Sequence, residues 1–231
     1  MLKHLLFLFF LIILTFNNSG SLGSNPENTN ATDVYHLLNL SAYGLPDNVF
    51  KLALKGFGNL EACGKLQNTS ILTIIDFSQS SKNKRMYVID LPGKKLLYNT
   101  YVAHGRNTGE EFATSFSNES GTHKSSLGFY TTCNSTQKSG VGLSLILYGI
   151  EKGFNDNAQK REIIMHGADY ATEDFIAKHG KLGRSFGCPS LPPDLIKPVS
   201  ETIKGGTCLF IYYPDENYIH HSGLLNTDQQ L

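Results

Sequence analysis

The chain has 231 residues, with 20 basic and 20 acidic side chains, so its formal net charge is zero. No basic run or stripe accompanies this balance, which argues against a protein that binds nucleic acid through a cationic surface. About 200 residues beyond the N-terminal leader are enough for one domain with a proper core.

The first residues predict export. Residues 1–4 form a short basic start, and the apolar run at 5–16 is too short for a spanning helix of ~20 residues but typical of a secretory signal peptide. We expect a signal peptide over residues 1–23 with cleavage near Ser24; the alternative is an uncleaved membrane anchor. We expect the mature chain to be exported to the periplasm or cell envelope, with no lasting membrane anchor after cleavage.

Residues 24–67 predict a linker followed by an N-terminal helical segment. Apolar residues recur at roughly helical spacing over 33–42 and 46–55. Gly56 and Gly58 follow the second pattern, as is typical of a helix end. We therefore expect two short helices that pack against the rest of the domain.

From residue 71 the pattern changes to short strands separated by turns. The β-rich runs are 71–77, 85–91, 96–103, 128–131, 143–147, 162–166 and 207–213. Many short strands and few long helices predict a mainly β, mostly antiparallel domain over 68–214, with a short helix at 192–203. The polar residues 215–231 are predicted to form a flexible tail.

Four cysteines remain after export, at positions 63, 133, 188 and 208. If one of them is a reactive thiol, at most one disulfide can form, so this is not a disulfide-scaffold protein. A bridge between Cys63 and Cys133 is conceivable. Cys208 lies in an apolar run and is expected to be an inert core residue.

The segment Gly-Arg-Ser-Phe-Gly-Cys-Pro at 183–189 could be a tight turn or a loop that displays a nucleophile. A residue before proline favours extended backbone, so we do not expect Cys188 within an α-helix. The predicted strand 162–166 ends at His166. An imidazole can take the proton of a thiol and then stabilise the thiolate, so Cys188 and His166 have the elements of a nucleophilic pair. A buried cysteine with an unrelated histidine is the alternative.

These residues resemble the catalytic signature of the L,D-transpeptidases, in which a histidine precedes a Ser/Thr-His-Gly-Cys segment. More closely, the chain resembles the murein L,D-transpeptidase catalytic domain family, in blocks at 102–105, 116–118, 126–130, 166–170 and 183–189. The resemblance implies a β-sandwich or open barrel with short N-terminal helices. The chain departs from the signature in three places: Phe186 replaces a histidine, Pro189-Ser190 replaces an apolar-Asn pair, and the loop after His166 is slightly longer.

The resemblance implies that Cys188 is the nucleophile, that His166 is its base, and that the Gly167 carbonyl holds the imidazole. Since Pro189 has no N–H, the oxyanion would be met by the amides of Gly187 and Cys188. No cofactor or metal is implied. The implied partners are peptidoglycan stem peptides, and we expect a monomer.

The implied reaction forms a cysteine thioester on a tetrapeptide stem, releases D-alanine and makes 3–3 cross-links. If water resolves the thioester, the activity is that of an L,D-carboxypeptidase. A different class of protein, a catalytically silent cell-wall-binding module, would keep the cleft without needing a reactive thiol.

Several residues near the pair are candidates for substrate binding. Arg184 can pair bidentately with a stem-peptide carboxylate, or serve as a surface arginine. His104 can line the cleft or cap a strand, and Tyr170 can wall the cleft or lie in the core. Ser185 and Phe186, next to the nucleophile, complete the set. Four other histidines are expected to be solvated loop residues outside the site: His123, His179, His220 and His221.

Three other enzyme classes place histidine and cysteine in one site. A zinc hydrolase could use His104, His166 and Cys188, although no His-Glu-x-x-His or close Cys-x-x-Cys spacing supports it. A sortase needs an arginine after the cysteine, and none follows Cys188. Papain-like enzymes put the cysteine first, at a helix start, which the Cys188-Pro189 bond disfavours.

Overall fold

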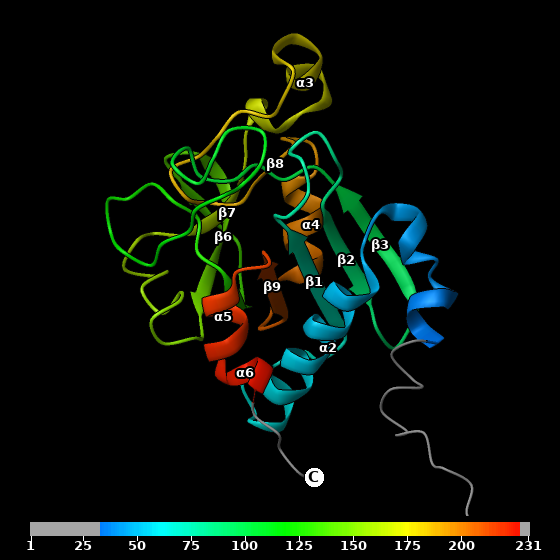
Figure 1. Cartoon of the computed structure of the whole chain (residues 1–231). Coiled ribbons are helices and arrows are strands. Elements are labelled where there is room, and N and C mark those ends of the chain that lie inside the picture. Colours follow the sequence, from blue (N-terminus) through cyan, green and yellow to red (C-terminus); the bar gives the residue numbers. More distant parts are fainter. Residues whose placement is uncertain (1–32, 227–231) are drawn as a thin grey trace, which may run out of the picture.

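The computed structural model describes residues 33–226, and its centre is a mixed sheet of nine strands (Figure 1). The predicted signal peptide over 1–23 and its cleavage site near Ser24 lie outside the described residues. The strands are β1 (Ile71–Asp76), β2 (Met86–Asp90), β3 (Lys95–Thr100), β4 (Gly128–Thr132), β5 (Gln137–Ser139), β6 (Gly142–Gly149), β7 (Ile164–Gly167), β8 (Ser190–Leu191) and β9 (Cys208–Tyr212). Their order is β3-β2-β1-β9-β4-β6-β7-β8, with β5 paired to β6.

The two central strands are buried on both faces. All side chains of β1 and β9 are buried, and the two strands pair in parallel with Leu72 opposite Cys208. Near-continuous apolar runs are typical of strands that are covered on both faces. In Figure 1, α2 (Asp47–Ala62) crosses in front of these strands and α4 (Ile196–Ile203) lies behind them, and both helices contact β1.

The two ends of the sheet approach each other. After β3 the chain forms isolated bridges with the other end of the sheet, Ala103 to Ser190 and Gly105 to Ser185. The sheet is therefore a nearly closed barrel. The predicted mainly β fold with short helices is confirmed, but the strands are not uniformly antiparallel, because β1–β9 and β7–β8 pair in parallel.

The N-terminal helical segment differs in length from the prediction. Residues 33–37 are helical and are followed by the 3-10 turn η1 (Leu40–Tyr43), whereas α2 runs through both glycines to Ala62. Gly56 lies within the helix rather than at its end, and it allows α2 to pack closely against Phe129. A Cβ at this position would lie 2.0 Å from Cζ of Phe129.

The segment from 215 is not a flexible tail, at least as far as Asn226. It forms α5 (Glu216–His221) and α6 (Gly223–Asn226). The Tyr218 hydroxyl donates to the Glu151 carboxylate at 2.8 Å, and Ser222 donates to the same group, which also accepts from the Phe129 amide at 2.7 Å. A buried carboxylate needs such donors, and they attach α5 to the start of β4.

Smaller elements complete the domain. The predicted helix at 192–203 begins four residues later, as α4, and the sequence patterns missed β5, β8, η2 (Asp169–Ala171) and α3 (Glu173–His179). Cys208 is fully buried, as predicted for a core residue, and burial raises the pKa of its thiol. No disulfide is present among residues 33–226.

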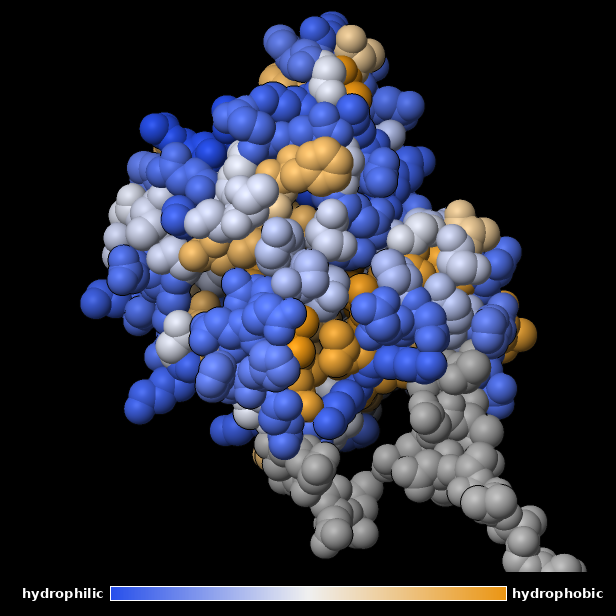
Figure 2. Space-filling view, viewed as in Figure 1, coloured by the Kyte–Doolittle hydropathy of each residue, from blue (hydrophilic) through white to orange (hydrophobic). Residues whose placement is uncertain are grey.

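The outer surface is mostly hydrophilic on the face shown in Figure 2, where one patch of apolar side chains lies between α5 and α2 and others lie above it. Within the described part of the chain, no helix is both long and apolar enough to cross a membrane.

Candidate active site

The segment at 183–189, called the nucleophile loop after the predicted role of Cys188, lies where the two ends of the sheet meet. A tight turn shapes it: the Ser185 hydroxyl donates to the Cys188 carbonyl at 2.6 Å and accepts from the Gly187 amide at 3.1 Å. Gly187 has φ of 121°, and a Cβ there would lie 2.8 Å from the Lys124 carbonyl oxygen. Only glycine fits this position without strain.

The turn is fastened to the opposite side of the barrel closure. The Ser125 hydroxyl donates to the Gly187 carbonyl at 3.1 Å and accepts from the Gly105 amide at 3.1 Å. The main chain of Ser185 is also bonded on both sides: its amide donates to the His104 carbonyl, and its carbonyl accepts from the Arg106 amide. Cys188 is therefore presented by a rigid frame that joins residues far apart in sequence.

The thiol of Cys188 is partly buried. Sγ donates to the carbonyl of Glu162 at 3.7 Å, and Glu162 holds that carbonyl in place by adopting a left-handed φ of 56° before β7. Burial raises the pKa of the thiol and the Glu162 carboxylate adds to this, while the Ile164 amide and the Arg161 guanidinium act in the opposite direction. The resting side chain of Cys188 is thus a thiol.

Arg161 supplies positive charge next to the nucleophile loop, where a Cβ on Gly187 would lie 3.4 Å from its Nη2. Its guanidinium donates to the Ser117 carbonyl at 2.7 Å, the Ser126 hydroxyl at 2.6 Å and the Lys124 carbonyl at 2.5 Å. Burial lowers the pKa of Arg161, and Cys188 is among the charges that raise it. Because a fixed cation favours the charged form of a nearby thiol, Arg161 favours the thiolate.

The tautomer of His166 follows from its hydrogen bonds. Nδ1 lies 3.0 Å from the Gly167 carbonyl, which can only accept, so Nδ1 carries a proton. In the neutral ring Nε2 is then an acceptor, and the Ser190 hydroxyl, 3.0 Å away, donates to it. The Tyr170 hydroxyl, 3.0 Å from Ser190, completes the chain. The lone pair that could take the proton of Cys188 is therefore occupied by Ser190.

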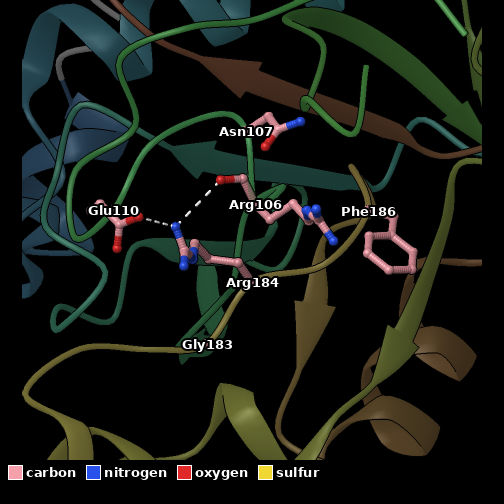
Figure 3. Close-up of a pocket in the computed structure, with 6 residues that line it drawn as sticks. All are labelled: Arg106, Asn107, Glu110, Gly183, Arg184 and Phe186. Atoms are coloured by element: carbon pink, nitrogen blue, oxygen red, sulfur yellow. Dashed lines mark hydrogen bonds and ion pairs between the residues drawn. The ribbon is translucent and has the colours of Figure 1, made fainter. Parts of the chain in front are cut away.

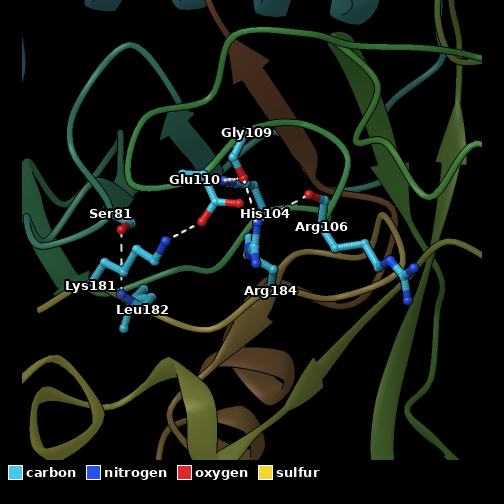
Figure 4. Close-up of polar contacts among 8 residues, drawn as sticks. All are labelled: Ser81, His104, Arg106, Gly109, Glu110, Lys181, Leu182 and Arg184. Atoms are coloured by element: carbon cyan, nitrogen blue, oxygen red, sulfur yellow. Dashed lines mark hydrogen bonds and ion pairs between the residues drawn. The ribbon is translucent and has the colours of Figure 1, made fainter. Parts of the chain in front are cut away.

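A pocket of about 520 Å³ adjoins the nucleophile loop (Figure 3). Arg184 and Phe186, both predicted to contact the substrate, line this pocket. The guanidinium of Arg184 pairs with the carboxylate of Glu110, which also binds Lys181 (Figure 4). Phe186 is 66% exposed, so its ring is available for contact.

Comparison with known proteins decides the family. The family model described as the L,D-transpeptidase catalytic domain matches residues 41–212. The chain belongs to this L,D-transpeptidase family.

Similar solved structures carry the same description at low identity. An L,D-transpeptidase from Mycobacterium smegmatis is 12% identical, with a TM-score of 0.39 over 62% of this chain and 59% of that chain. L,D-transpeptidase 3 from Mycobacterium tuberculosis is 13% identical, with a TM-score of 0.37 over 62% and 61%. The C442S mutant of the Enterococcus faecium L,D-transpeptidase is 14% identical, with a TM-score of 0.36 over 62% and 50%. No curated protein is significantly similar.

His104 lies inside the L,D-transpeptidase domain rather than at its surface. It is 1% exposed, its Nδ1 accepts from Arg85 at 2.8 Å, and its Nε2 lies 3.2 Å from the Gly109 carbonyl. Burial and then the charge of Arg85 lower the pKa of His104 to about 3, so the ring is neutral. Both nitrogens are occupied by protein groups, which leaves none free for a ligand.

Ser185, predicted to bind substrate, and the Gly187 amide, predicted to bind the oxyanion, are hydrogen-bonded to each other. Ser185 uses its hydroxyl within the turn, and the Gly187 amide donates to that hydroxyl. Among the described residues, no acceptor is bound to the amide of Cys188. Of the two amides expected to meet the oxyanion, that of Cys188 has no acceptor within residues 33–226, whereas that of Gly187 must first leave the Ser185 hydroxyl.

The structure adds three residues that the sequence did not indicate: Arg161, Ser190 and Arg106. Ser190 was noted only as a departure from the family signature, and the sequence patterns did not single out Arg161. Arg106 lines the pocket. Within residues 33–226, no three His, Cys, Asp or Glu side chains are grouped as metal ligands would be.

Proposed function

We propose that this L,D-transpeptidase is exported and transfers acyl groups between peptidoglycan stem peptides through Cys188. The observation that carries the proposal is the His166 imidazole, whose tautomer the Gly167 carbonyl fixes so that Nε2 is the acceptor. A neutral acceptor nitrogen next to the nucleophile loop is what a thiol needs to become a thiolate at neutral pH.

The reaction begins when the Ser190 hydroxyl turns away and Nε2 of His166 takes the thiol proton. The Cys188 sulfur attacks the carbonyl on the L-centre of the third, diamino-acid residue of a tetrapeptide stem. A C–S bond forms, the C–N bond to D-alanine breaks, and the imidazolium returns its proton to the departing amine. The amide of Cys188 donates to the oxyanion, an interaction worth ~3 kcal/mol in the transition state of other enzymes.

The second half of the reaction resolves the thioester. An amine from a neighbouring stem attacks its carbonyl, His166 takes the amine proton, and the sulfur leaves, which yields a 3–3 cross-link. If water attacks instead, the same site is an L,D-carboxypeptidase. Phe186, where the signature has histidine, removes a polar group from this side of the site, and it favours no particular acceptor.

Incubation with a tetrapeptide muropeptide tests the proposal. The wild-type protein should release D-alanine and gain the mass of a thioester-linked stem, and Cys188→Ala should do neither. Cys208→Ala is the matched control: it removes a buried thiol from β9 and should keep both activities with some loss of stability. Release of D-alanine by Cys188→Ala at the wild-type rate would contradict the mechanism.

The products decide between the two enzyme activities, since cross-linked dimers indicate transpeptidation and tripeptides alone indicate hydrolysis. Labelling by a carbapenem, located by mass spectrometry, distinguishes an enzyme from a silent wall-binding module. The enzyme should be acylated at Cys188 only. Export is tested by N-terminal sequencing of the mature protein, which should begin near Ser24 and lack residues 1–16.

A further inference from the structure

The pocket beside the nucleophile loop holds more positive than negative charge. Arg106 and Arg184 line it together with a single carboxylate, that of Glu110 (Figure 3). Glu110 is already bound to both Arg184 and Lys181, and these two cations hold the pKa of its carboxyl below the ordinary value. Among the described residues, no carboxylate pairs with Arg106.

The side chain of Arg106 is held in place by an aromatic ring. Its Cζ lies 5.4 Å from the centre of the Phe186 ring, and that ring also stacks on His123 with centroids 4.6 Å apart. A guanidinium over an aromatic face keeps its N–H donors at its edge, where they can bind a carboxylate with two parallel hydrogen bonds. Figure 3 shows the guanidinium pointing toward Phe186 and away from Glu110.

The main chain of Arg106 is fixed relative to the nucleophile. Its amide donates to the Ser185 carbonyl at 2.8 Å, three residues before Cys188, and its carbonyl accepts from Arg184 at 3.4 Å. The Arg106 side chain therefore extends from a main chain that is fixed relative to Cys188. Arg184, the arginine that the sequence suggested for this role, is neutralised by Glu110 instead.

We propose that Arg106, supported by the ring of Phe186, binds a free carboxylate of the peptide that reacts with Cys188. This inference rests on the proposed function and names the group that the site recognises. A tetrapeptide stem can offer that group from two places: the terminal carboxylate of D-alanine, and the carboxylates further back in the stem, on the diamino acid and on the residue before it.

Binding to a protein without the nucleophile tests the inference. The tetrapeptide is titrated into Cys188→Ala and into the double variant Cys188→Ala/Arg106→Gln, with calorimetry as the readout. Loss of a charged, bidentate contact should weaken binding by about 10- to 100-fold. The matched control is Lys181→Gln in the same background. It removes one positive charge from the same cluster but not from the pocket lining, and it should change affinity by less than about threefold.

Two modified peptides identify the source of the carboxylate. One carries a C-terminal amide, and the other carries amides in place of the free carboxylates further back in the stem. The peptide that lacks the recognised carboxylate should bind weakly to the parent protein, Cys188→Ala. Its affinity should not fall further in the double variant Cys188→Ala/Arg106→Gln. Equal affinity of parent and Arg106→Gln for the unmodified peptide, or no binding to the parent, would overturn the inference.

These outcomes are separate from the fate of the proposed function, because Cys188→Ala cannot form a thioester. If the wild-type protein released D-alanine but Arg106→Gln bound like its parent, the reaction would stand and the carboxylate site would not. If Arg106→Gln weakened binding while the wild type released no D-alanine, the carboxylate site would stand and the proposed reaction would not.

Discussion

Replacing Ser190 with alanine should make the nucleophile react faster while the fold becomes less stable. The Ser190 hydroxyl is fully buried and lies 3.0 Å from both Nε2 of His166 and the Tyr170 hydroxyl. Each bond contributes about 1 kcal/mol to stability, so the loss of both should cost about 2 kcal/mol and lower Tm by about 4–8 °C in a domain of this size.

The same change frees the lone pair of Nε2. In the wild type, the bond donated by Ser190 must break before His166 can take the proton of Cys188. Removing a bond worth about 1 kcal/mol should speed thiol activation about fivefold. The tautomer should persist, because the bond from Nδ1 to Gly167 is unchanged.

The assay is alkylation by iodoacetamide at pH 7, followed by mass spectrometry of the peptide that contains Cys188, with Cys133 as an internal reference thiol. Tyr170→Phe is the matched control. It loses only the outer bond of the chain, so its Tm should fall by about 2–4 °C and its alkylation rate should stay within about twofold of the wild type. A folded Ser190→Ala protein that reacts tenfold more slowly than the wild type would refute the reasoning and make Ser190 a required positioning residue.

Three further predictions concern charge and stability. Because the folded-state pKa of His104 is lowered from 6.5 to about 3, the unfolded chain binds a proton that the native state does not, and stability falls as pH falls through this window. Denaturant titrations should show that the free energy of unfolding falls by about 3 kcal/mol between pH 6.5 and 4 because of this group. His104→Gln should lose this part of the pH dependence, and the same pH dependence in that variant would contradict the reasoning. Arg161→Gln should slow alkylation of Cys188 and shift its pH profile upward, because a charge that favours the thiolate is lost, whereas Arg161→Lys should retain most of the wild-type rate. Tyr218→Phe takes one donor from the buried Glu151 carboxylate and should cost about 1.5–3 kcal/mol, and an unchanged Tm would show that water replaces the hydroxyl.

Much of the fold was predictable because strands have a local signature. The runs at 71–77 and 128–131 match β1 and β4 almost residue for residue, since each is a short run of apolar, aromatic or β-branched residues bounded by turns. The elements that the patterns missed are short or polar. β8 has two residues, and α5 is a polar segment whose order depends on Glu151, 67 residues before Tyr218.

The sequence by itself determined the chemical elements of the site: a cysteine between glycine and proline, a histidine at a strand end, and the family signature that joins them. Only the tertiary structure decided how these groups work. The bond between Ser190 and His166 spans 24 positions, and that between Ser125 and Gly187 spans 62. The assignment of Arg106 rather than Arg184 to the open cationic position depended on Glu110 pairing with a residue 74 positions away. Hydrogen bonds and ion pairs of this range arise when the barrel closes, because closure brings the ends of distant strands into contact, and no local pattern of residues encodes which side chains will meet there.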